Sequence, residues 1–198
     1  MIIRMHKVIH ILFIGFSLLG ANASIAESDQ HHRIALETSN AFMQKLAHTM
    51  KTEMKANGPV SAIKVCTEMS PKIAGDISRD KGWRVTRVGT RVRNPMLAAP
   101  DAWEQKVLAH FQTRAAKGEA LHSMVYSEMV EEPNGKYFRF MKAIGVKQVC
   151  LTCHGSESDI PDSVKAILSE RYPHDKAIGY EVGDLRGAVS IKQPVADM

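Results

Sequence analysis

The spacing of apolar residues predicts long helices in the first part of the chain. Between Ser28 and Asn57, apolar side chains recur every four residues, as on one face of a helix, at Phe42, Leu46, Met50 and Met54. Gly58-Pro59 is a stop signal, and a second segment with helical spacing runs from Val60 to Lys81, ending at Gly82. Within this second segment Ser70-Pro71 is a candidate break, with Ser70 as N-cap and Pro71 at the first helical position.

Shorter elements are predicted in the rest of the chain. Alternating or apolar runs indicate strands over Trp83–Val88, Met124–Val130, Lys136–Ile144 and Gly187–Lys192. Pro133-Asn134-Gly135 predicts a hairpin between the middle two strands, whereas Asn94-Pro95 and Ala99-Pro100 mark a loop. A capping box at Asp101–Glu104 opens a helix that ends near Gly118, and Ser163–Tyr172 predicts a short helix. Helices first and strands later favour an α+β domain with an antiparallel sheet.

The first 26 residues have the character of an export signal. Arg4 and Lys7 begin it, Val8–Leu19 is apolar, and small residues offer cleavage after Ala23 or Ala26. The apolar core is shorter than the roughly 20 residues that span a bilayer, which favours cleavage over the alternative of an uncleaved anchor. We therefore expect a signal peptide at residues 1–26, one domain at 27–198 and a periplasmic protein with no stable membrane span after cleavage.

Composition narrows the class of protein. The 198 residues are 44% hydrophobic and 24% charged, which excludes a collagen, a mostly disordered chain and a polytopic membrane protein. Removal of the two signal cations, Arg4 and Lys7, lowers the net charge from +5 to +3. This small charge on an exported chain argues against nucleic acid as a partner.

Cys150-Leu151-Thr152-Cys153-His154 has the C-x-x-C-H spacing of a c-type haem attachment site. The two thiols can reach the two vinyl groups of one porphyrin and form thioethers, and the adjacent imidazole of His154 then falls under the iron as proximal ligand. A redox dithiol would prefer a thioredoxin-like βαβ context, and structural zinc would need further paired ligands. The motif predicts one covalent haem c.

The motif leaves the second axial ligand of the iron open. Cys66 has no intramolecular partner once Cys150 and Cys153 hold the porphyrin, and its thiolate would stabilise ferric iron and lower the potential. The alternative is a buried structural thiol, because Cys66 lies on an apolar stripe. A methionine, which would raise the potential, or a histidine are the other candidates: Met141, His48, His110, His122 and His174.

Basic residues cluster at Arg84, Arg87, Arg91 and Arg93. Buried haem propionates need cationic partners, and arginine can hold a carboxylate with two parallel hydrogen bonds. The alternative, a solvated strand face, is at least as well supported for Arg84 and Arg91. We therefore take Arg93 and Arg87, together with Met141, as candidate pocket residues.

Several short stretches match, in order, those of a known family: Ala62–Cys66, Ser78–Trp83, Arg93–Pro95, Ala99–Glu104, Phe138–Ile144, Cys150–Gly155 and Asp184–Ala188. On these stretches the chain resembles the exported monohaem c-type proteins with a PAS-like fold, catalogued as a domain of unknown function. The resemblance implies a central antiparallel sheet flanked by helices. It also implies iron ligated by His154 and Cys66, and Arg93 near the haem. Val88-Gly89-Thr90 departs from the family pattern.

Three functions from different classes remain. The first is a redox or small-ligand (gas) sensor, whose thiolate is displaced from iron and whose signal passes to a separate protein. The second is a soluble periplasmic electron carrier with a redox partner. The third, a haem enzyme of sulfur-compound oxidation, ranks last because no substrate motif is visible, and we expect the protein not to be an enzyme.

Overall fold

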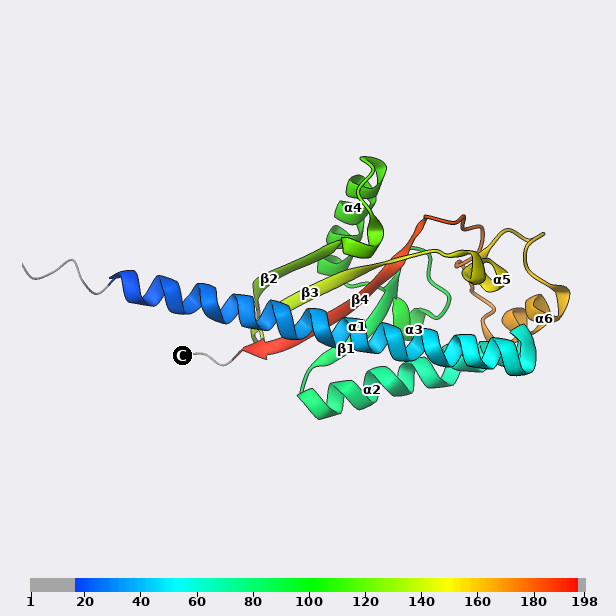
Figure 1. The fold of residues 1–198 in the computed structure, drawn as a ribbon, viewed down its shortest axis with the longest axis horizontal. Helices are drawn as coiled ribbons and strands as arrows, with labels where there is room; N and C mark the ends of the chain where they lie inside the picture. The colour runs from blue at the N-terminus through cyan, green and yellow to red at the C-terminus, as the bar shows by residue number, and fades with distance from the viewer. Residues whose placement is uncertain (1–16, 196–198) are drawn as a thin grey trace, which may run out of the picture.

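A four-stranded antiparallel sheet forms the centre of the protein, in the order β1-β4-β3-β2 (Figure 1). The computed structural model describes residues 17–195, with side chains from residue 27, so residues 1–16 of the predicted signal lie outside the described part. The strands are β1 (Arg84–Gly89), β2 (Val125–Glu132), β3 (Gly135–Gly145) and β4 (Leu185–Val195).

Helices flank this sheet on both faces (Figure 1). The first three helical segments are continuous: α1 (Ser17–Lys64), the π-helical turn η1 (Val65–Met69) and α2 (Ser70–Lys81). The later ones are α3 (Pro95–Ala98), α4 (Ala102–Ala116), η2 (Leu121–Ser123), η3 (Gln148–Cys150), α5 (Leu151–His154) and α6 (Asp162–Arg171). The predicted PAS-like α+β class, with an antiparallel sheet and long N-terminal helices, is confirmed.

The two faces of the sheet bury different cores. On one face Phe42 and Leu46 of α1 pack, with α2 and η1, against Phe140 and other residues of β1, β3 and β4. On the opposite face Phe111 and other apolar residues of α4 pack against Met141 of β3. Because successive residues of a strand point to opposite faces, each strand contributes to both cores.

The break predicted at Gly58-Pro59 is a bend within α1. Gly58 has φ 78° and ψ −178°, a conformation that glycine adopts without steric cost. The backbone is already helical at Ser17, earlier than the predicted start at Ser28. Among the helices of residues 17–195, none combines the length and apolar character needed to cross a membrane.

The sequence pattern predicted the position of the β2–β3 hairpin correctly but placed the end of the last strand too early. β2 and β3 meet at Pro133-Asn134, as expected, with Glu132 paired to Gly135. β4 extends to Val195, beyond the predicted end at Lys192. Pro194 suits this extension because the pairing with β1 stops at Lys192, so Pro194 has a strand neighbour on one side only.

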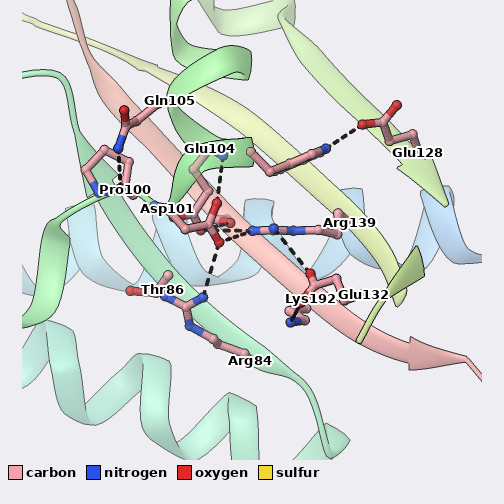
Figure 2. A network of polar contacts seen from close by, with 12 residues as sticks. Arg84, Thr86, Pro100, Asp101, Glu104, Gln105, Glu128, Glu132, Arg139 and Lys192 are labelled. Atoms are coloured by element: carbon pink, nitrogen blue, oxygen red, sulfur yellow. Dashed lines mark hydrogen bonds and ion pairs between the residues drawn. The ribbon is translucent and has the colours of Figure 1, made fainter. Parts of the chain in front are cut away.

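A group of charged side chains lies between the sheet and the start of α4 (Figure 2). Arg139 of β3 donates to Oδ2 of Asp101 at 2.6 Å and lies 3.5 Å from Oε1 of Glu104. Glu104 is fully buried and also accepts the Ser190 hydroxyl at 2.6 Å. The predicted capping box is present, since Asp101 and Glu104 each accept the other's backbone N–H. We call this group the α4-face network: Arg84, Asp101, Glu104, Glu132, Arg139 and Lys192.

Candidate functional site

The segment Cys150–His154, called here the attachment segment, lies beyond the end of β3. Cys150 is the last residue of η3, and the following four residues form the single helical turn α5. The two cysteines and His154 therefore lie within two consecutive short helical turns. Cys150 packs on a small core of Val146, Ala177 and Tyr180, whereas Cys153 packs on a different one around α6. The attachment segment is therefore held between two small cores and is partly exposed itself.

The ring of His154 has a defined orientation. Its Nδ1 lies 2.7 Å from the carbonyl oxygen of Ala177, and because a carbonyl only accepts, Nδ1 carries the proton. Burial and the positive charges of Arg93 and Arg186 hold the pKa of His154 well below its ordinary value. The imidazole is therefore neutral, with an unprotonated Nε2 that can bind a metal ion. Tyr180 packs edge-on against this ring, with centroids 6.2 Å apart.

Cys66 lies in the π-helical turn η1. The sequence predicted a break at Ser70-Pro71, but the chain stays helical there, with Met69 as N-cap and α2 beginning at Ser70. Proline has no N–H, and its ring clashes with the carbonyl four residues earlier, here that of Thr67. The N–H of Ser70 bonds instead to the carbonyl of Val65, five residues back, which widens the turn. Pro71 thus explains the π turn that carries Cys66, and such turns are frequent at functional sites.

Cys66 lies close to the attachment segment although it is 84 positions before Cys150 in the sequence. Burial, and after it the electrostatic influence of nearby Cys66, raises the pKa of Cys153 to about 11. Burial, and after it Cys66, likewise raises the pKa of Tyr172. Apolar packing also links the end of α1 to the attachment segment, because Ile63 belongs to the cluster on which Cys153 packs. The end of α1 and η1 therefore bring the third cysteine to the other two.

Arg93 contacts the attachment segment directly. It is 9% exposed, and its Nη2 donates to the carbonyl oxygen of Cys153 at 2.5 Å. Its Nε donates to Asp175 at 2.8 Å, in an ion pair that is almost fully buried. The side chain is thus already engaged by groups of the protein. Arg93 therefore lies beside the attachment segment, and its contacts are with the protein backbone and Asp175.

Two other arginines lie near His154. Arg87 pairs with Val189 across the strands and shares the sheet face of α1 and η1 with it, because Val189 belongs to that core. Arg186 occupies the point where the pairing of β3 with β4 shifts between Ile144 and Gly145, so a bulge redirects its side chain. Burial, together with the charges of Arg93 and Arg87, lowers the pKa of Arg186. We call Arg87, Arg93 and Arg186 the arginine group.

The remaining candidates lie elsewhere. Met141 is fully buried in the core under α4, on the opposite sheet face from Arg87. The structure thus corrects its assignment to the pocket, because strand alternation turns it away from η1. The four histidines considered as ligands are all exposed: His48, His110, His122 and His174. Arg84 pairs with Asp101 and belongs to the α4-face network. Arg91 donates to the carbonyl oxygens of Ile178 and Gly179 and stacks on Tyr180.

A family model described as Tll0287-like matches residues 21–194. The chain belongs to the Tll0287-like family. Its fold is similar to that in "Crystal structure of the cyanobacterial heme-protein Tll0287", with a TM-score of 0.65 and 26% identity. The match covers 85% of this chain and 98% of that one. No curated protein sequence matches the chain. The family agrees with the resemblance found in the sequence.

In this member of the Tll0287-like family, the fold brings together Cys66, the attachment segment and the arginine group. Sequence reasoning missed Arg186, although Asp184–Ala188 was one of the matching stretches. The available signal was Gly187 at the start of the predicted strand Gly187–Lys192, directly after Arg186, because a glycine in a strand often marks a bulge. A Cβ on Gly187 would lie 2.0 Å from the carbonyl oxygen of Val88, so this close approach of β1 requires glycine.

The donor set fits an iron porphyrin. Two thiols of suitable spacing, a neutral imidazole with a free Nε2 and a third thiol are the groups that such a cofactor takes. Arg87 makes no ion pair within residues 27–195 and lies on the same side of the sheet as η1. Its uncompensated charge suits an anionic group such as a propionate.

Proposed function

We propose that the protein is an exported c-type monohaem protein whose iron is ligated by His154 and Cys66. The observation that carries the proposal is the convergence of Cys66 on the attachment segment, beside an imidazole whose Nδ1–H is already bound to Ala177. Cys150 and Cys153 would each add a thiol S–H across one vinyl group, a step in which no group leaves. Arg87 and Arg186 would neutralise the propionates.

Covalent attachment is tested by mass spectrometry. The mature chain isolated from the periplasm of a host competent for cytochrome c maturation should carry the mass of one haem. The matched control is the double variant Cys150→Ser/Cys153→Ser, which should show the mass of the polypeptide alone. A parent protein without added mass, from a host that loads another cytochrome c, would refute covalent haem.

Ligation by Cys66 is tested on the loaded protein. Cys66→Ser should remove the low-spin ferric EPR signature of a thiolate-ligated haem and raise the midpoint potential, because a thiolate stabilises ferric iron. Met69→Ser, three residues along the same π turn and exposed, is the control and should leave the spectrum as it is. An unchanged spectrum in Cys66→Ser would exclude Cys66 from the iron.

We further propose that the physiological role is sensing of redox state or of a small gaseous ligand. Bound haem would supply a one-electron couple and an iron ion that can exchange ligands. The two sides of the site differ in a way that favours exchange at Cys66. His154 is held by Ala177 and packed by Tyr180, whereas no residue between 27 and 195 hydrogen-bonds to the Cys66 thiol. Release of Cys66 would be transmitted through η1 into α1 and α2, and from there to a separate partner protein.

Redox potentiometry combined with CO or NO titration distinguishes this role from electron transfer. Sensing predicts that the ferrous protein binds CO or NO with loss of Cys66 ligation. An electron carrier predicts a six-coordinate haem that is inert in both oxidation states. The partial exposure of the attachment segment favours the electron carrier as the second candidate, since it would place the haem edge near the surface.

A further inference from the structure

Arg93 and Asp175 hold the segment that carries the hydrogen-bond partner of His154. Nε of Arg93 donates to Oδ2 of Asp175 at 2.8 Å, and the two side chains are only 10% and 12% exposed. The second carboxylate oxygen of Asp175 accepts the N–H of Ala177 at 2.7 Å. One carboxylate therefore joins the loop after β1 to the backbone of the segment that follows α6.

The carbonyl group of Ala177 is held from a second side. Nη2 of Arg93 lies 3.4 Å from this oxygen, and it donates to the carbonyl oxygen of Cys153 at 2.5 Å. Ala177 is fully buried, so water does not compete for its carbonyl oxygen, which accepts Nδ1–H of His154. Arg93 thus contacts both the residue before His154 and the oxygen that orients its ring.

We propose that the Arg93–Asp175 pair is a positioning clamp for His154, which fixes the Ala177 carbonyl and thereby directs Nε2 of the imidazole toward the iron. The inference rests on the proposed function, because this direction matters only when Nε2 binds a metal. Outer partners of a metal-bound histidine fix its tautomer and raise its basicity. A more basic imidazole stabilises ferric iron, so a loosened clamp raises the midpoint potential.

Two conservative substitutions separate the clamp from the charge of its members. Arg93→Lys keeps the positive charge but loses the planar fork that reaches Asp175 and Cys153 together. Asp175→Asn keeps an oxygen for the N–H of Ala177 but removes the ion pair. Arg114→Lys is the matched control, because Arg114 pairs with Glu119 at the far end of α4, away from the attachment segment.

The test uses the haem-loaded mature chain. Arg93→Lys and Asp175→Asn should each raise the midpoint potential and broaden the ferric low-spin EPR signal, because the imidazole plane is no longer fixed. Arg114→Lys should leave both quantities at the parent value. A purely structural role would reduce the yield of haem-loaded protein but would leave the midpoint potential and EPR signal of the protein that is loaded unchanged. Parent-like potentials and spectra in both clamp variants would overturn the proposal.

A second measurement decides the matter when a variant does not accumulate in loaded form. In the haem-free full chain labelled with ¹⁵N-histidine, His154 should be protonated at Nδ1, and each clamp variant should gain a fraction protonated at Nε2. An unchanged tautomer in both variants would contradict the clamp. This readout requires no haem, whereas the absence of haem from the parent would refute the proposed function alone.

Discussion

The α4-face network and the arginine group place arginine side chains in very different surroundings. In the network, three cations lie among three carboxylates: Arg84, Arg139 and Lys192 with Asp101, Glu104 and Glu132 (Figure 2). In the arginine group, the one carboxylate within residues 27–195 that forms an ion pair is Asp175, which pairs with Arg93. Arg87 and Arg186 have no such partner there.

This difference separates a structural role of charge from a binding role. A buried charge is costly unless it is paired, so a balanced network needs nothing further from outside the chain. The arginine group, near Cys66 and the attachment segment, has more positive than negative charge among residues 27–195, and an anionic ligand would offset this surplus. The surplus of positive charge therefore points to a ligand before the ligand is identified.

The largest expected effect is the decrease in unfolding free energy when Arg139 is removed. Arg139→Ala leaves the fully buried Glu104 without its cation, and breaking a buried pair in this way costs about 3–5 kcal/mol of the unfolding free energy. Urea unfolding of the haem-free chain measures it. Arg87→Ala is the comparison: it removes a half-buried charge that has no ion-pair partner within residues 27–195, so it should not destabilise the fold. Equal losses in both variants would erase the distinction between the two regions.

A smaller effect on stability is expected from the energetic coupling between Glu104 and Arg139 in this network. Glu104→Gln with Arg139→Met removes both charges while retaining a hydrogen-bonding side chain at the capping box. The double variant should be more stable than the sum of the two single changes predicts, by about 1–3 kcal/mol, the coupling typical of contacting groups. Additive losses in a double-mutant cycle would show that Arg139 acts through packing on Trp103 rather than through charge.

The binding role of the arginine group is tested through the potential of the loaded protein. Arg87→Gln removes a positive charge that destabilises ferric iron, so the midpoint potential should fall. At roughly 10 Å and an effective dielectric constant of about 20, one charge contributes about 1–2 kcal/mol, or tens of millivolts. Arg84→Gln, in the α4-face network, should have a smaller effect. Equal shifts would mean that the two regions do not differ in their distance from the iron.

The smallest effect is a change in acid stability. Burial alone would raise the pKa of Asp101, but the Arg139 hydrogen bond, the Glu104 N–H and the nearby cations outweigh it and lower the pKa. The stability from Asp101 is therefore present above its ordinary pKa and is lost as pH falls through the lowered folded-state pKa. Asp101→Asn retains an N-cap side chain, so the fold should persist. In urea unfolding between pH 6 and 2, the variant should lose less stability with falling pH than the parent. A dependence of unfolding free energy on pH as steep as in the parent would assign the acid sensitivity to other carboxylates.

Local patterns predicted much of the fold and part of the site. The bend at Gly58, the capping box at Asp101 and the hairpin at Pro133-Asn134 depend on neighbouring residues only, and each is present. The π turn and the bulge at Arg186 were not predicted, because each arises where a local element meets another part of the chain. Met141 was misplaced because a strand pattern shows that a side chain is buried but not on which face.

By itself the sequence determined that Cys150, Cys153 and His154 form an attachment motif, because their chemistry requires only short-range spacing. It also determined that Cys66 was left over as the third cysteine. Only the tertiary structure decided that Cys66 lies near this motif, since Ile63, three residues before Cys66, packs in the same small core as Cys153. It likewise decided that Arg93 binds Asp175 while Arg87 has no ion-pair partner between residues 27 and 195, because partners distant in sequence meet only when the chain has folded.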